Sequence, residues 1–284
     1  MQAHAQITLP IVLIVVFAGA LHAAWNAIAK YLDDRLVVFA LIGVASTIGG
    51  GGALALTGLP DHAAIGFAAV SAVIHIGYDL ALMNSYRLGA FNQVYPIARG
   101  TSPLVVAFGA YFLADEHLGV VPLAGVAILA TGLICLALSS GRVSADEFPA
   151  VSAAVATGLA IAGYTIVDGL GVRRAHDPYA YAALLFLLQG PVFPAVAAIR
   201  RPGLSWLTRP AAGKGLLAGA LSLVAYGIVL WAQTHAPLAE VAAIRETSVV
   251  FAALIGMKLF AERFGVRRLA AALVVAAGIV AISA

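Results

Sequence analysis

The stretch "RGTSPLVVAFGAYFLADEHLG", residues 99–119, decides how the chain is interpreted, because it returns 146 positions later as "RETSVVFAALIGMKLFAERFG", residues 245–265. When residues 99–134 are laid over residues 245–280 without a gap, twelve of the 36 positions are identical. Shared Ala and Leu carry little weight in an apolar chain, but the match also includes Arg, Thr, Ser, Glu and Gly in register. We therefore interpret the chain as two copies of one unit.

The composition indicates a membrane protein. Of the 284 residues, 62% are hydrophobic and 10% are charged, whereas soluble domains average about 45–50% apolar and about 25% charged residues. The formal net charge is +3, but the basic residues stand mostly between apolar segments, which favours membrane topology over nucleic-acid binding. The single cysteine, Cys135, excludes a disulfide framework or a thiolate metal site, and we expect it to pack in the core.

Apolar runs long enough to span a bilayer, which takes roughly 20 residues, occur ten times. Pro, Gly and charged residues cluster between the runs, and the runs do not alternate as barrel strands would. The start "MQAHAQ" has no Lys or Arg, so we expect the first run to stay as a spanning helix rather than to be a cleaved signal peptide. The sequence thus predicts an all-α membrane protein with ten transmembrane helices, at about 7–29, 36–57, 63–86, 92–114, 119–140, 149–171, 178–199, 215–233, 238–260 and 267–283.

The duplication predicts two five-helix repeats, residues 1–141 and 149–284, joined by a linker at 142–148. Because five is odd, the second repeat enters the membrane from the opposite side to the first. Inverted repeats of this kind are typical of secondary transporters, which bind the substrate between the halves and open to each side in turn. Arg99 and Arg245 are then one structural position seen twice, and a weaker match sets Gly19 over Gly158.

Several segments resemble the drug/metabolite transporter superfamily, in particular its ten-helix EamA-like exporters. They are "LHAAWNAIAK", "VYPIARGTSPLVVAFGAYFLADEHLG" and "RETSVVFAALIGMKLFAERFG". The likeness covers nearly the whole chain and includes a Glu after the fourth and the ninth runs. Asp115 and Ala261 stand where the family usually has Gly, and Pro103 is Val249 in the second copy. The resemblance implies transport of a small polar metabolite, with amino-acid exporters resembled most.

Charged residues inside apolar runs are costly and normally face a cavity or a partner. Arg99 is a candidate anchor for a substrate carboxylate or phosphate, and alternatively a structural clamp on carbonyls between the repeats. Arg245 has Glu246 beside it and Glu240 on the same helix, so we expect a local ion pair there. We keep Arg99, Arg245 and Glu246 as candidate substrate-binding residues.

His75 and Asp79 are four residues apart, a spacing that puts both on one helical face. A carboxylate paired with imidazole could carry a proton, because imidazole titrates near neutrality; a buried hydrogen-bonded pair is the structural alternative. Tyr78 borders them but points about 100° away, so it is a candidate for either binding or packing.

Further candidates come from the first and sixth runs. His22 and Asn26 share a face by the same spacing, and Trp25 could stack on an aromatic or cationic substrate or anchor the helix at the membrane interface. Tyr164 and Asp168 are again four apart. Weaker candidates, each favoured as a packing residue, are Tyr95, Gln189, Tyr226 and Trp231.

The basic residues predict orientation. Counting Lys258 at a helix end, the odd-numbered loops hold twelve Lys or Arg, whereas the even-numbered side holds Arg173 and Arg174 alone. Basic loops remain cytoplasmic, so both termini are predicted to lie outside the cytoplasm of a bacterial-type inner membrane, although the family resemblance favours the opposite orientation.

The sequence-based hypothesis is therefore a secondary transporter that exports small polar metabolites, most readily amino acids, by alternating access. Its expected partners are the small-molecule substrate, membrane lipid and, if transport is coupled, protons; nucleic acid, cofactor and metal are not expected. One alternative is a carrier of sugars, nucleotide sugars or lipid-linked head groups. A membrane-embedded enzyme is disfavoured, because no catalytic motif is present and the polar groups are scattered.

Overall fold

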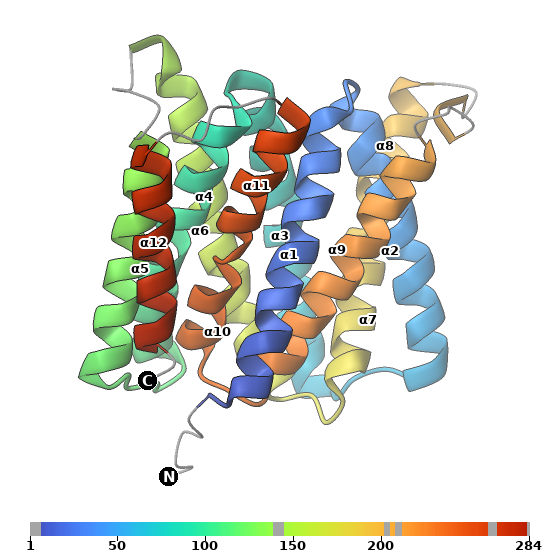
Figure 1. Ribbon diagram of the computed structural model, residues 1–284. Helices are drawn as coiled ribbons and strands as arrows, with labels where there is room; N and C mark the ends of the chain where they lie inside the picture. The colour runs from blue at the N-terminus through green and yellow to red at the C-terminus, as the bar shows by residue number, and fades with distance from the viewer. Residues whose placement is uncertain (1–6, 139–144, 202–204, 208–211, 261–265, 283–284) are drawn as a thin grey trace.

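The computed structural model describes residues 7–138, 145–201, 205–207, 212–260 and 266–282. Over these ranges the chain is helical and contains no strand. Six of the helical segments are long and apolar enough to cross a membrane (Figure 1): Leu9–Tyr31, Arg35–Thr57, His62–Leu88, Phe148–Val172, Pro178–Arg200 and Ala212–Gln233. The start of the chain and linker residues 142–144 lie outside the described residues, as do Ala261 and Glu262, which is the Glu after the ninth run.

The α-helices overlap the ten apolar runs of the sequence. Eight runs are each one helix, and two runs are interrupted. The single helices are α1 (Leu9–Tyr31), α2 (Arg35–Thr57), α3 (His62–Leu88), α4 (Phe91–Leu113), α5 (Val120–Leu138), α6 (Phe148–Val172), α9 (Ala212–Gln233) and α12 (Val266–Ile282); the interrupted runs are α7 (Pro178–Gln189) with α8 (Val192–Arg200), and α10 (Leu238–Arg245) with α11 (Ser248–Phe260).

The break between α10 and α11 has a visible cause in the backbone hydrogen bonds. The amides of Glu246 and Thr247 donate to the carbonyls three residues before them, at 3.0 Å each. Such bonds tighten the turn and end the regular α-helical ladder. The equivalent segment of the first half, around Thr101, remains inside the continuous helix α4 even though that helix contains Pro96 and Pro103.

The helices pack in pairs that correspond between the two halves. Helix α1 lies against α9, as α6 lies against α3; α1 also lies against α10 and α11, as α6 lies against α4. Helix α2 contacts α9, as α7 contacts α3, while α5 packs against α12 and α2 against α7. Figure 1 shows α5 and α12 side by side at one edge of the bundle, and it shows that α1 begins and α12 ends on the same side.

The outer surface of the bundle is apolar. Large aliphatic side chains such as Leu56, Val120 and Ile199 are 81–89% exposed, which fits a surface that faces lipid rather than water. Cys135 is also exposed, on α5. The expectation that it packs in the core was wrong. On a helix that faces lipid, the apolar outer surface accommodates a small thiol as readily as the protein core does.

Candidate functional site

A cavity lies between the helices of the two halves. Its empty volume is about 610 Å³, including the part that is open to solvent, and its walls come from α1, α2, α3, α6, α7, α8 and α9. Half of the residues predicted from the sequence as candidate binding residues line it: His22, Trp25, His75, Tyr78, Asp79 and Tyr164. The candidates on α1, α3 and α6 are therefore brought together although they are up to 142 positions apart in the chain.

Among the described residues that line the cavity, Asp79 is the only Asp, Glu, Lys or Arg. Within the described residues its carboxylate has no hydrogen bond or ion pair. The i, i+4 spacing allowed a hydrogen bond between Asp79 and His75, but the two side chains do not form one. Instead, the Nδ1 atom of His75 lies 3.0 Å from the carbonyl of Ser71 and 3.1 Å from its hydroxyl. A carbonyl can only accept, so Nδ1 carries the proton, and this nitrogen fixes the ring of His75 to its own helix.

The ring of His75 packs against several aromatic side chains. It stacks on Tyr164 with ring centroids 3.9 Å apart, and it meets Tyr226 edge-on at 5.1 Å. Tyr78 meets Tyr164 edge-on at 5.4 Å. Offset-stacked and edge-to-face pairs are the arrangements that aromatic rings prefer, so these rings fix one another's orientation at the cavity wall.

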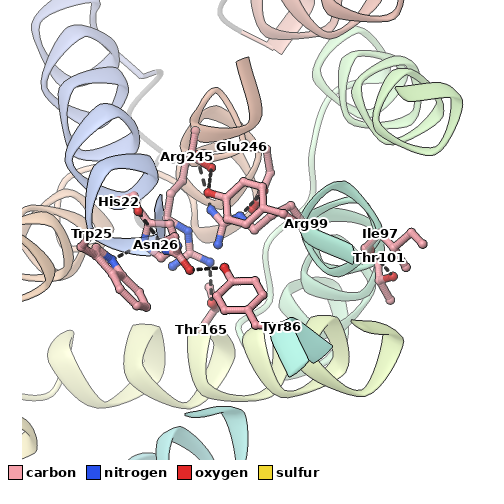
Figure 2. A network of polar contacts seen from close by, with 12 residues as sticks. His22, Trp25, Asn26, Tyr86, Ile97, Arg99, Thr101, Thr165, Arg245 and Glu246 are labelled. Carbon is pink, nitrogen blue, oxygen red and sulfur yellow. Dashed lines mark hydrogen bonds and ion pairs between the residues drawn. The ribbon is translucent and has the colours of Figure 1, made fainter. Parts of the chain in front are cut away.

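The polar residues of α1 form a second ordered group (Figure 2). The indole N–H of Trp25 donates to Nδ1 of His22 at 3.3 Å, and the amide of Asn26 donates to the carbonyl of His22 at 2.8 Å. The Tyr86 hydroxyl donates to Oδ1 of Asn26 at 2.6 Å. Trp25 is buried, which excludes the interpretation that it anchors the helix at the membrane interface. The side chain of Asn26 is hydrogen-bonded to residues of α1 and α3 and does not line the cavity.

A buried ion pair joins the two halves beside the cavity. The Nε atom of Arg99 on α4 lies 2.7 Å from Oε2 of Glu246 at the α10–α11 break, with both side chains at most 1% exposed. Within the described residues neither atom has a hydrogen-bond partner, so the contact is an interaction between charges. Arg99 also donates to the carbonyl of Arg245, at 3.5 Å, and Figure 2 shows its guanidinium reaching into the broken segment.

The expected local pair between Arg245 and its own helix is not the arrangement found. Glu246 pairs with Arg99, while Arg245 donates to the hydroxyl of Thr165 at 3.3 Å and lies over the Tyr164 ring, 5.8 Å from its centroid. Arg245 and Glu246 therefore have separate partners, on α6 and on α4 respectively. Neither Arg99 nor Arg245 lines the cavity.

The remaining predicted residues are buried behind the cavity wall. Asp168 is fully buried and accepts hydrogen bonds from the hydroxyls of Tyr181, at 2.8 Å, and Tyr226. The Tyr95 hydroxyl donates to Ser248 at the start of α11, at 3.0 Å. Both residues thereby connect helices around the cavity rather than facing into it.

Glu116 has a role that sequence reasoning did not assign. Both of its carboxylate oxygens accept from the amide of Leu238, at 2.9 Å, and Arg173 lies 2.7 Å from Oε1. The carboxylate therefore caps the N-terminus of α10, where free amides and the helix dipole favour negative charge. The shared Glu of the repeat was the signal, but its partner lies 122 positions away.

Several cavity residues were ranked low or missed. Gln189 and Tyr226, favoured as packing residues from the sequence, line the cavity, together with Phe39, Ser46, Phe186, Phe193 and Ser222. Nothing in the local sequence separates these from the many other aromatic and hydroxyl side chains of apolar helices. Among the described residues, no group of three His, Cys, Asp or Glu could hold a metal ion.

The comparisons with known proteins agree with this architecture. The model of the EamA-like transporter family matches residues 148–284, just under half of the chain, and this match is consistent with the drug/metabolite transporter superfamily. No curated protein matches the chain.

A solved structure has the same fold over nearly its full length. One crystal structure of a protein aligns over 96% of this chain and 98% of its own, with a TM-score of 0.73 and 17% sequence identity. At this level of identity the likeness concerns the fold.

Proposed function

We propose that the protein is a secondary transporter that exports small polar metabolites, most readily amino acids, by alternating access between two inverted five-helix repeats. The repeats are residues 1–141 and 149–284, with residues 142–148 as the linker. One observation carries the proposal. Each helix contact described above has a counterpart in which the two halves have exchanged places, and these helices surround one cavity.

Two pairs of glycine contacts support the inverted repeat. A Cβ on Gly19 of α1 would lie 2.6 Å from Oγ1 of Thr247, and a Cβ on Gly158 of α6 would lie 2.6 Å from Cβ of Thr101. Gly19 and Gly158 are equivalent in the repeat, as are Thr101 and Thr247. Each half therefore presents a glycine to the same threonine of the other half, as a pseudo-two-fold axis requires.

The second pair lies between α5 and α12. A Cβ on Gly132 would lie 3.0 Å from the backbone N of Val275, and a Cβ on Gly278 would lie 2.7 Å from the backbone N of Leu129. The 146-residue shift carries Gly132 onto Gly278 and Leu129 onto Val275. Close backbone approach at small residues is a common form of helix association in membranes, and here it occurs twice in equivalent form.

The cavity is in the right place for alternating access. His22, Trp25 and Asp79 come from the first half, and Tyr164 and Tyr226 come from the second. Rocking of one half against the other would change the access to such a cavity without rebuilding its wall. We propose that His22, Trp25, His75, Tyr78, Asp79 and Tyr164 touch the substrate, and that Asn26, Tyr95, Arg99, Asp168, Arg245 and Glu246 position them.

The orientation follows from the basic loops. The described basic residues Lys30, Arg35, Arg87 and Arg200 stand at helix ends on one side of the bundle, opposite Arg173 at the end of α6 (Figure 1). The positive-inside rule assigns the first side to the cytoplasm of a bacterial-type inner membrane. We therefore propose that both termini lie on the other side; a cytoplasm-dependent reporter fused to the C-terminus would be inactive.

Counterflow in proteoliposomes tests the function. We expect preloaded unlabelled amino acids to accelerate uptake of at least one radiolabelled amino acid, and empty liposomes to show no exchange. Gly19→Leu, which would wedge α1 away from the α10–α11 break, should abolish exchange, whereas Gly77→Leu, which faces open space, should retain it. Exchange of sugars or nucleotide sugars alone would replace the amino-acid assignment with the carrier alternative, and no exchange of any solute would overturn the transport proposal.

A further inference from the structure

We propose that the cavity recognises an organic cation, with Asp79 as the counter-ion and the surrounding aromatic rings as the cation-binding wall, and that it rejects anionic substrates. The inference rests on the proposed function in so far as the bound cation is the transported group. Binding itself can be measured independently of transport.

The first argument is the charge of the wall. Among the described residues of the wall, Asp79 is the only Asp, Glu, Lys or Arg, and its carboxylate has no hydrogen bond or ion pair with another described residue. A carboxylate removed from bulk water is stable only if a counter-charge or hydrogen-bond donors compensate it. A ligand ammonium group provides both, because it brings a positive charge and N–H donors.

The second argument is that the nearby cations are already engaged. Arg99 lies against Glu246, and Arg245 is held by Thr165 and the Tyr164 ring. Neither lines the cavity. A phosphate or an isolated carboxylate entering the cavity would therefore approach Asp79 without a Lys or Arg to pair with, and like charges at short range repel.

The third argument is the aromatic wall. Trp25, Tyr78, Phe186, Phe193 and Tyr226 all line the same cavity as Asp79. Aromatic faces attract cations, with about 0.5–2 kcal/mol for each well-placed ring. Tyr164 already uses its ring against His75 and Arg245, so we assign the ligand contact chiefly to the other rings, and Phe186 offers a ring without any hydrogen-bonding group.

The cavity also offers neutral polar groups, from Ser46, Gln189 and Ser222. These can donate to a hydroxyl or to the carboxylate of a zwitterion, but they do not neutralise a net negative charge. The inference therefore favours amines and amino acids with a free or additional ammonium group. It disfavours nucleotide sugars and phosphorylated lipid head groups as substrates of this site.

Three probes that share one ring and differ in charge test the inference: phenethylamine, which is a cation at pH 7, neutral 2-phenylethanol and anionic phenylacetate. Their binding to the purified full-length protein is measured by titration calorimetry. We expect phenethylamine to bind at least tenfold more tightly than 2-phenylethanol, and phenylacetate to bind most weakly. This ranking uses the unaltered protein, so it does not depend on any variant folding.

The variants then assign the charge preference to residues. Asp79→Asn should weaken phenethylamine binding at least tenfold and leave 2-phenylethanol binding unchanged. Phe186→Leu should weaken phenethylamine binding about two- to tenfold, and Asp146→Asn, which removes an exposed carboxylate, should change nothing. Phenylacetate binding as tightly as phenethylamine, equal phenethylamine binding by Asp79→Asn, or no binding of any probe would overturn the inference.

The two proposals fail separately. If amino acids exchange in counterflow but the three probes bind equally well, the transport proposal is supported and the cation site is refuted. If phenethylamine binding depends on Asp79 but no solute shows counterflow, the cation site is supported and the transport proposal is refuted.

Discussion

The buried pair between Arg99 and Glu246 allows a quantitative test of how the two halves are held together. Glu246→Met removes the carboxylate and leaves the Arg99 guanidinium, which is 1% exposed, without its 2.7 Å counter-ion. Removing one partner of a buried pair costs about 3–5 kcal/mol, because the remaining charge is desolvated without compensation. The carbonyl of Arg245, at 3.5 Å from Arg99, offsets part of this cost, so we expect a loss of about 3 kcal/mol.

That loss translates into a measurable shift of the melting temperature. An unfolding entropy of about 2.1 cal/mol/K per residue gives about 0.6 kcal/mol/K for a chain of this length. A loss of about 3 kcal/mol therefore lowers the melting temperature by about 5 °C. Intrinsic fluorescence of the detergent-solubilised protein, recorded during a thermal ramp, measures the shift.

The double variant Arg99→Met with Glu246→Met provides the control. Replacing a whole buried ion pair by apolar side chains is often neutral or stabilising, so the double variant should melt within about 2 °C of the unaltered protein, far above Glu246→Met. If Glu246→Met melts unchanged, or if the double variant is less stable than both single variants, the pair is not the compensating contact described above.

Three further predictions use the same thermal assay. Glu116→Gln weakens the cap on α10 and the contact with Arg173, which is partly exposed, so we expect a loss of about 1–2 kcal/mol; an unchanged melting temperature would contradict the capping role. Asp115 has φ 54°, a left-handed conformation that Asp tolerates better than Ala, so Asp115→Ala should cost about 1 kcal/mol while Asp115→Gly costs nothing; equal loss in both would point to the side chain instead. Gly158→Ala brings a Cβ to 2.6 Å from Thr101 and should cost about 1–3 kcal/mol, whereas Gly77→Ala, which meets open space, should be neutral or stabilising; equal effects would refute the close approach of α6 and α4.

The helical elements were predictable because their signal is local. Apolar runs of spanning length end at turns, and the expected positions of α1, α2, α6 and α9 differ from those in the structure by at most three residues at each end. The repeat added a long-range statement that composition alone does not contain. It set Gly19 over Gly158, and each of these glycines packs against the corresponding threonine of the other half, Thr247 or Thr101. It also set Arg99 over Arg245, but these two side chains have different partners, Glu246 for Arg99 and Thr165 for Arg245.

The break at Glu246 was not predictable from the repeat. The first copy has Gly100 at the equivalent position, and α4 remains continuous there although glycine is the weaker helix former. The difference arises from tertiary contacts. Arg99 holds the Glu246 carboxylate and the Arg245 carbonyl, and Tyr95 holds Ser248. These partners on α4 compensate the groups that the break leaves without a regular helical bond.

The separation of cavity residues from framework residues has the same physical origin. The i, i+4 spacings correctly put polar residues on common helix faces, but a face can turn toward a neighbouring helix or toward the cavity. Asn26 meets Tyr86, and Asp168 meets Tyr181 and Tyr226, so these groups are satisfied behind the wall. Asp79 has no such partner within the described residues and lines the cavity. Whether a buried polar group binds substrate thus depends on whether a neighbouring helix supplies its partner. The partners named here lie on other helices, 13 to 60 positions away in the chain.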